Sequence, residues 1–111
     1  KYYVALASDQ NAGEKGTINN LFNMPTSTPK GAAILNIKNN TSIIISFIVM
    51  NKDYSYSISS KKLRINSKND SIEEKIFNIN EAYNKELEKN IVKYPEQYFW
   101  FHKKWNKKDY K

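Results

Sequence analysis

The sequence SIEEKIFNINEAYNKELEKNIVK, residues 71–93, decides the class of fold that this chain can adopt. Ser71 followed three residues later by Glu74 forms the capping-box pattern that begins a helix. Apolar side chains then recur at helical spacing, with glutamates and lysines between them, at Ile72, Ile76, Ile79, Tyr83, Leu87 and Ile91. The stretch therefore predicts a long amphipathic helix, and Pro95 breaks it from the segment that follows.

Two β-type stretches precede this helix. Residues 42–50, SIIISFIVM, are rich in β-branched side chains and nearly continuous in apolar residues, which is typical of a strand covered on both faces. After a turn at 51–53, Tyr54, Tyr56 and Ile58 alternate with serines, which is the pattern of a half-exposed strand. We therefore expect the two strands to pair as a hairpin.

The N-terminal part predicts one more strand and one short helix. Residues 2–8, YYVALAS, are a short β-type run, and residues 11–23 predict a loop. Residues 31–37 have helical character, with Thr28 as the N-cap and Pro29 at the first helical position. The order strand, helix, strand, strand, helix predicts an α/β fold, with a layered mixed sheet and flanking helices.

The composition narrows the possible functions. The chain has 111 residues, which suits one small domain, and no apolar run long enough to span a bilayer. It has no cysteine and one histidine, so we expect no metal and no cofactor. The formal net charge is +7, and lysines gather near the C-terminal end, at Lys103, Lys104, Lys107, Lys108 and Lys111. Such an end favours an anionic surface, although a solvated tail is equally consistent with it.

No catalytic set can be assembled from these residues. His102 has no carboxylate at the positions that would orient a general base. Gly13 and Gly16 lack the spacing of a phosphate-binding loop. Asp9 is better placed, because it ends a β-type run and begins a loop, where ligands of α/β sheets commonly bind, and Gln10 and Asn11 add hydrogen-bonding groups there. A simple Asx turn that closes the strand is the competing interpretation of Asp9.

The segment YPEQYFWFHKKW, residues 94–105, is dense in aromatic side chains. Pro95 suits the first turn of a helix, where its missing N–H is not needed, and Glu96 beside it suits the helix dipole. Large rings beside lysines can lie against an apolar surface while the charges stay in water. The segment is therefore expected to cover a core, a lipid or a partner.

Two blocks of the chain resemble a known family. Residues 95–105 closely resemble the C-terminal signature of the lipid A biosynthesis acyltransferases, the bacterial lauroyl and myristoyl transferases that complete the secondary acyl chains of lipid A. Residues 6–16 and 21–33 are similar to the family's Asp-Gln loop and to the Phe-Gly-x-Pro-x-x-Thr-x-x-Gly run that opens its next helix. Order and spacing hold over nearly the whole chain, although Asn23 stands where the family has glycine.

The resemblance implies that residues 1–111 are the C-terminal portion of a single, glycerolphosphate-acyltransferase-like domain, inactive alone. Family members carry an N-terminal membrane anchor and a catalytic His-x4-Asp/Glu motif, in which the histidine deprotonates a sugar-linked hydroxyl that attacks an acyl thioester on acyl carrier protein. Both would lie before Lys1, so no catalytic residue is expected in this chain. The implied partners are acyl carrier protein, a lipid A precursor and the membrane surface, with no nucleic acid, and the implied location is the cytoplasmic face of the bacterial inner membrane.

The resemblance also suggests roles for particular residues. Asp9 and Gln10 are candidates for lining or supporting the binding site of the acceptor substrate. The residues expected to fix the terminal segment against the body are Pro95, Glu96, Gln97, Trp100 and His102. In addition, an incomplete domain should expose an apolar sheet edge where upstream strands would pair.

Two other functions remain open. One alternative is a small basic module that binds anionic membrane or nucleic acid through residues 103–111 and the neighbouring rings, with a self-sufficient fold and salt-dependent binding. The other is a related acyltransferase that acts on a different lipid acceptor.

Overall fold

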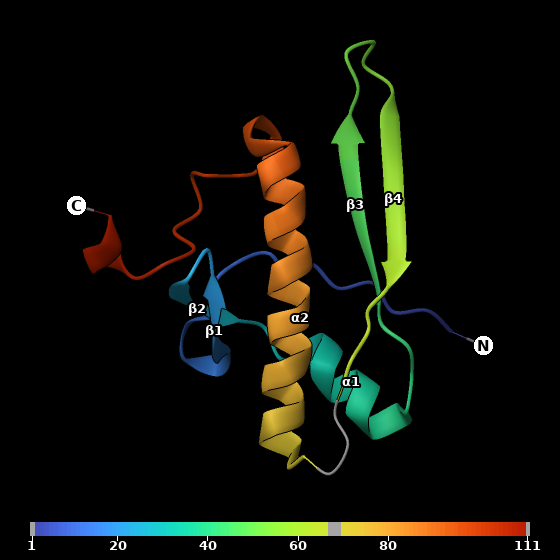
Figure 1. The fold of residues 1–111 in the computed structure, drawn as a ribbon, viewed down its shortest axis with the longest axis vertical. Coiled ribbons are helices and arrows are strands. Elements are labelled where there is room, and N and C mark those ends of the chain that lie inside the picture. The colour runs from blue at the N-terminus through green and yellow to red at the C-terminus, as the bar shows by residue number, and fades with distance from the viewer. Residues whose placement is uncertain (1, 67–69, 111) are drawn as a thin grey trace.

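The computed structural model describes residues 2–66 and 70–110 (Figure 1). Its elements in chain order are a 3-10 turn at Gly13–Lys15, strands β1 (Thr17–Leu21) and β2 (Met24–Thr28), helix α1 (Gly31–Asn39), strands β3 (Ile44–Met50) and β4 (Tyr56–Lys62), helix α2 (Ile72–Lys93), and 3-10 turns at Pro95–Gln97 and Lys107–Asp109. Helix α2 runs through the middle, with the β1–β2 hairpin on one side and α1 and the β3–β4 hairpin on the other (Figure 1).

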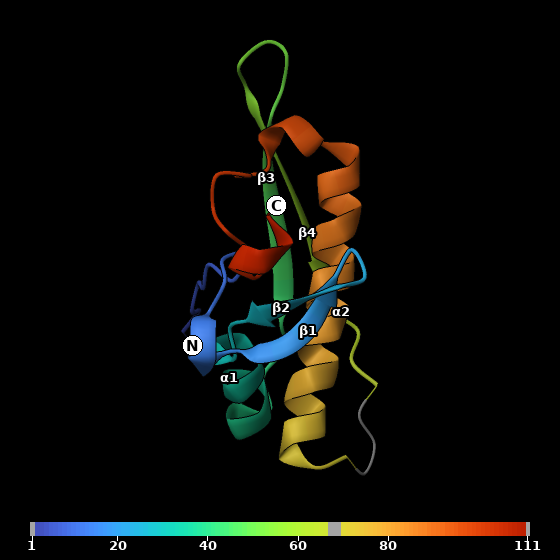
Figure 2. The ribbon, with the colours of Figure 1, turned by 90° about the vertical axis from the view of Figure 1, so that its left-hand side faces the viewer.

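The chain is a mixed α/β domain, as predicted, but its strands form two separate sheets. β1 pairs with β2, and β3 pairs with β4, and both pairs are antiparallel. A single layered mixed sheet is therefore not confirmed for the part of the chain that the structure describes. Figure 2 shows the β1–β2 hairpin crossing α2 at a steep angle, while β3 runs along the helix.

Helix α2 begins as the capping box predicts. The Ser71 N–H donates to Glu74 Oε2 at 2.7 Å, and the Glu74 N–H donates to Ser71 Oγ at 3.2 Å. These bonds from Ser71 hold the pKa of the exposed Glu74 carboxyl below its usual value. The helix ends at Lys93, and Pro95 begins the next 3-10 turn, so the predicted break is confirmed.

The apolar face of α2 supplies two separate cores. One joins Leu87 and Ile91 to Leu21 of β1, and Phe47 of β3 packs against it. The other joins Ile79 to Ala33 of α1 and to Leu63, which follows β4. The helix therefore connects the two hairpins, which belong to separate sheets and share no strand pairing.

Polar groups of α2 hold the β1–β2 hairpin by its backbone. Asn84 is fully buried, and its Nδ2 donates to the Asn20 carbonyl at 3.0 Å and to Thr28 Oγ1 at 3.1 Å. Further along the helix, Glu88 Oε1 accepts from the Phe22 N–H at 2.5 Å. Leaving the buried Asn84 amide donor unbonded would be costly, so these contacts favour one position of the hairpin on the helix.

The β1–β2 hairpin corrects the prediction of a loop over residues 11–23. Its two-residue connection is Phe22-Asn23, with φ of 53° and 59°, the positive values that a type I′ turn requires. Phenylalanine is unusual in that conformation, and Pro25 interrupts the strand pattern, so the sequence concealed the hairpin. Pro25 is accommodated because it lies exposed on a two-stranded sheet.

Two predictions about the N-terminal part are also wrong. Residues 2–8 form no strand, because they find no partner strand among the described residues and are mostly exposed. Helix α1 forms as expected, but Thr28 is not its N-cap. Thr28 ends β2 and is fully buried under α2, and Lys30 occupies the N-cap position without a side-chain bond.

The β3–β4 hairpin is confirmed, but β3 is covered on one face only. Ile45 and Val49 are buried, whereas Ile44 and Ile48 are 62% and 64% exposed. Every residue of β4 is exposed, so its predicted half-burial is wrong. No layer lies over this outer face in the described part of the chain, and that explains the difference. No helix among residues 2–66 and 70–110 has the length and apolar character needed to cross a membrane.

We expect Leu87→Ala to lower the free energy of unfolding by about 2–5 kcal/mol, because it opens a cavity between α2 and β1. Val92→Ala is the matched control on the exposed side of the same helix and should cost no more than about 0.5 kcal/mol. Urea unfolding followed by circular dichroism measures both variants. Equal effects would mean that the Leu87 contact does not hold the helix and the hairpin together.

Candidate functional site

A groove of about 700 Å³ lies between the N-terminal segment, β3, α2 and the residues that follow α2. Most of its walls are apolar, and Leu6, Leu35, Phe47 and Leu87 contribute to them. Asp9 is the only charged side chain among the described residues that line it. A single carboxylate in a mainly apolar groove is a typical arrangement for fixing the orientation of a ligand.

Two tyrosine side chains line the groove near Asp9. Burial raises the pKa of Tyr98 to about 12, and the charge of Asp9 adds to the effect. Burial and then the charge of Asp9 also raise the pKa of Tyr83, on α2, well above its ordinary value. Both hydroxyls therefore keep their protons at neutral pH and can donate hydrogen bonds. Together with the Asp9 carboxylate, they can bind a ligand that carries hydroxyl groups.

The Asp-Gln turn, residues 9–11, is held by the terminal signature, residues 95–105. The Asn11 N–H donates to His102 Nε2 at 2.8 Å, across 91 residues of sequence. Asn11 Nδ2 donates to the Lys104 carbonyl at 2.7 Å, and Lys104 Nζ donates to the Gln10 carbonyl at 3.2 Å. The fold thus brings together the two blocks on which the sequence resemblance rests.

The imidazole ring of His102 is engaged in a structural hydrogen bond. Because Nε2 accepts the Asn11 N–H, this nitrogen has no lone pair left to take a proton from a substrate in this arrangement. The Gln10 side chain is exposed, and Gln10 contributes its carbonyl to the contact with Lys104. Of the two candidates for the acceptor site, only Asp9 lines the groove.

The remaining signature residues make other contacts, and Gln97 also lines the groove. Gln97 bonds the end of β3 twice, since the Met50 N–H donates to Gln97 Oε1 at 2.8 Å and Gln97 Nε2 donates to the Met50 carbonyl at 2.9 Å. Trp100 Nε1 donates to the Pro95 carbonyl at 2.7 Å, within the segment itself. Glu96 is exposed. Gln97 therefore connects the segment to the body, and Trp100 bends the segment on itself.

Sequence reasoning missed the residues that surround Asp9. Tyr83 stood out only as one member of an apolar helical stripe, and Lys104 only as one lysine in a basic end. Asn11 was expected only to add hydrogen-bonding groups beside Asp9, and its bonds to His102 and Lys104 were not foreseen. Among residues 2–66 and 70–110, no cluster of three or more histidine, cysteine or acidic side chains could hold a metal ion.

We expect the free energy of unfolding to rise with pH between about pH 7 and about pH 9.5 because of Lys104. Burial lowers the pKa of this amine to about 8 in the folded chain, whereas the unfolded chain keeps the ordinary value of 10.5. The unfolded state therefore binds more protons in this window, so stability must increase with pH. The increase, on the order of 2 kcal/mol, should be seen in urea unfolding and should be absent from Lys104→Met.

Lys103→Met is the control, because Lys103 is the exposed neighbour and should leave the rise unchanged. The window ends below about pH 10, since Tyr83 and Tyr98 keep their protons in the folded chain after the unfolded chain has lost them. Above that pH, the two tyrosines make the free energy of unfolding fall as pH rises. The same rise in Lys104→Met as in the wild type would mean that another group is responsible.

Comparison with known proteins gives one family. No curated protein matches the chain. A family model described as bacterial lipid A biosynthesis acyltransferase matches residues 1–107, and this range includes both the Asp-Gln turn and the terminal signature. The protein therefore belongs to the bacterial lipid A biosynthesis acyltransferase family, and this membership indicates acyl transfer as its general activity.

Proposed function

We propose that this chain is the C-terminal portion of an enzyme that moves a fatty acyl chain from acyl carrier protein to a lipid A precursor. The reaction would take place at the cytoplasmic face of the bacterial inner membrane. Family membership supports acyl transfer in general. The observation that carries the more specific proposal is the position of Asp9, a lone carboxylate in an apolar groove beside two protonated tyrosines.

The exposed face of the β3–β4 hairpin supports the view that the chain belongs to a larger domain. Ile44, Ile48 and Ile58 are each more than 60% exposed, at 62%, 64% and 68%. Isolated two-stranded hairpins are marginally stable, and an apolar face of this kind is normally covered. In the complete enzyme, further strands and helices would pack beside this face, which borders the groove through Ile44 and Ile48, and would complete a layered, glycerolphosphate-acyltransferase-like sheet.

The catalytic base would come from the missing part of that domain. In the His-x4-Asp/Glu motif of the family, the histidine removes the proton from a sugar hydroxyl of the acceptor. The hydroxyl oxygen then attacks the thioester carbonyl, and the thiol of the carrier leaves. Within this chain, Lys107 stands five residues after His102, and Nε2 of His102 already accepts from Asn11, so His102 does not fit that role.

The residues of this chain would act on the substrates by binding. The Asp9 carboxylate can accept hydrogen bonds from acceptor hydroxyls, and the hydroxyls of Tyr83 and Tyr98 can donate to acceptor oxygens. Gln10 would support the turn through its backbone. The net charge of +7 suits the acidic surface of acyl carrier protein, because complementary charge speeds encounter.

A second candidate function, binding of an anionic surface, rests on the exposed terminal residues. Phe101 is 91% exposed, and Lys103, Lys107 and Lys108 are exposed near it in the sequence. For this function, we expect Lys107→Glu with Lys108→Glu to weaken sedimentation with vesicles rich in phosphatidylglycerol at least about tenfold at low salt. Vesicles of phosphatidylcholine are the control. Binding that depends neither on the salt concentration nor on the two lysine charges would contradict this function.

For acyl transfer, we expect Asp9→Ala in the longer protein that contains this chain to lower turnover about 10–100-fold, because a hydrogen bond to a charged group is worth about 1.5–3 kcal/mol. The folded fraction should not change. The measurement is transfer of a radiolabelled acyl group from acyl carrier protein to a lipid A precursor, with circular dichroism on the same samples.

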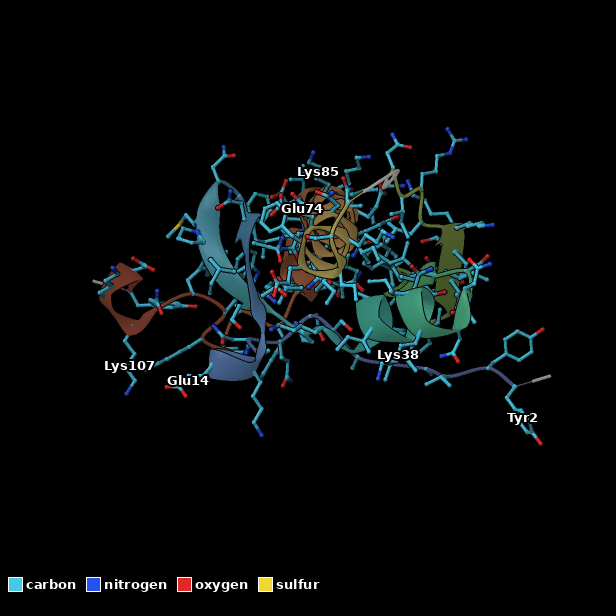
Figure 3. All side chains as sticks on the ribbon, turned by 90° about the horizontal axis from the view of Figure 1, so that it is seen from below. Tyr2, Glu14, Lys38, Glu74, Lys85 and Lys107 are labelled. Atoms are coloured by element: carbon cyan, nitrogen blue, oxygen red, sulfur yellow. The ribbon has the colours of Figure 1, made fainter. Side chains whose placement is uncertain are left out.

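Glu14→Ala is the matched control, since Glu14 is an exposed carboxylate in the next turn of chain, at the edge of the molecule (Figure 3). It should leave turnover unchanged. Loss of folded protein in proportion to lost activity would make Asp9 structural. The coding sequence upstream of Lys1 gives an independent check, because an apolar anchor and a His-x4-Asp/Glu motif should be encoded there.

A further inference from the structure

The Asp-Gln turn is held from behind by a residue that does not line the groove. Lys104 is fully buried and reaches the turn through both its side chain and its backbone. Its carbonyl accepts from Asn11 Nδ2 at 2.7 Å and also from Thr26 Oγ1 of β2 at 2.5 Å. Lys104 is therefore anchored on the β1–β2 sheet, and it connects that sheet to the turn that carries Asp9.

The Lys104 amine also responds to the charge of Asp9. Burial lowers the pKa of this amine, and the charge of Asp9 acts in the opposite direction, so the two groups interact. The other titratable groups that respond to Asp9 are Tyr83, on α2, and Tyr98, in the segment after α2, and both are neutral at physiological pH. His102 contacts the turn through Asn11. Lys104 is thus a cation that responds to the Asp9 carboxylate.

Burying a charged amine costs free energy, because the amine loses its hydration. For Lys104, the effect of burial outweighs the attraction of the Asp9 charge, and the amine is held by its bond to the Gln10 carbonyl at 3.2 Å. Lys103 and Lys107, on either side, are exposed, so burial of Lys104 is specific to this position. An apolar side chain here would keep the packing but lose both the charge and the bond to the Gln10 carbonyl.

We propose that Lys104 is a positioning residue for the acceptor site, which fixes the Asp-Gln turn from behind through its charged amine and its carbonyl and so keeps Asp9 at the groove. This proposal rests on the proposed function, in which Asp9 contacts the acceptor. Lys104 itself touches no substrate, because it is fully buried and lies outside the groove lining. Its removal should therefore affect turnover beyond any effect on stability.

The first test compares Lys104→Met with Lys103→Met in the longer acyltransferase. Lys104→Met should lower kcat about tenfold or more, after correction for the folded fraction, and should leave KM for the acyl carrier protein unchanged. Lys103→Met should behave as the wild type. A loss of kcat that only follows the loss of folded protein would overturn the proposal.

A pH profile separates charge from packing. In the wild type, kcat should fall above about pH 8, as the buried amine loses its proton. Lys104→Arg carries a guanidinium that stays charged, so its kcat should persist through this range. Identical alkaline limbs in the two proteins would overturn the proposal, because the charge of Lys104 would then be irrelevant.

A double-mutant cycle covers the case in which arginine does not fit the buried site. In an Asp9→Asn background, Lys104→Met should cause no further loss of kcat, because the partner that it positions is already gone. Losses that multiply independently would overturn the proposal.

A separate measurement distinguishes failure of this proposal from failure of the proposed function. If the wild type shows no acyl transfer at all, the proposed function fails, and amide hydrogen exchange then tests the positioning alone. The Asn11 amide should exchange about tenfold faster or more in Lys104→Met than in Lys103→Met, while the amides of α2 stay protected. Equal exchange at Asn11 would overturn the role of Lys104.

Discussion

Helix α2 has to bury apolar side chains against two hairpins at once, and the rest of the structure depends on this packing. Leu87 and Ile91 meet Leu21 of β1, while Ile79 meets Ala33 and Leu63 on the other side. Neither two-stranded sheet would be stable without such support. The polar contacts of Asn84 and Glu88 then decide where the first hairpin sits on the helix, because a shifted hairpin would leave buried groups without partners.

The candidate site is a consequence of this arrangement. Once α2 is fixed, the segment after it must turn at Pro95 and return toward the β1–β2 hairpin, where His102 and Lys104 meet the Asp-Gln turn. The groove forms between these parts, and Tyr83 enters it from the same helix that carries the core. The core and the groove therefore share side chains of one helix, since Leu87 and Tyr83 contribute to both, and a carboxylate can be held in apolar surroundings because its neighbours are rigid.

Much of the fold could be predicted because the signals were local. The Ser71–Glu74 capping box, the helical stripe of α2 and the β3–β4 hairpin each depend on residues close in sequence. The β1–β2 hairpin could not be found, because its turn places Phe22 in a conformation that phenylalanine rarely adopts. Burial of Lys104 could not be found either. Nothing in a run of lysines indicates which one the tertiary structure turns inward. The burial follows only when the terminal segment folds back against the β1–β2 hairpin. Asp9 lines the groove, although the β-strand that it was expected to end does not form, so its role as part of the acceptor site stays a prediction.

The long separation between Asp9 and its supports has a consequence for damaged or shortened forms of the protein. The bonds from the Asp-Gln turn reach across 91 to 94 residues, whereas both apolar cores are complete before Pro95 apart from side chains that cover their edges. A product that stops before His102 would keep most of its cores, and with them its helix content and much of its resistance to proteases. It would nevertheless leave the turn that bears Asp9 unfastened. A mutation that terminates translation there would therefore give a helical protein whose Asp9 turn lacks its supports.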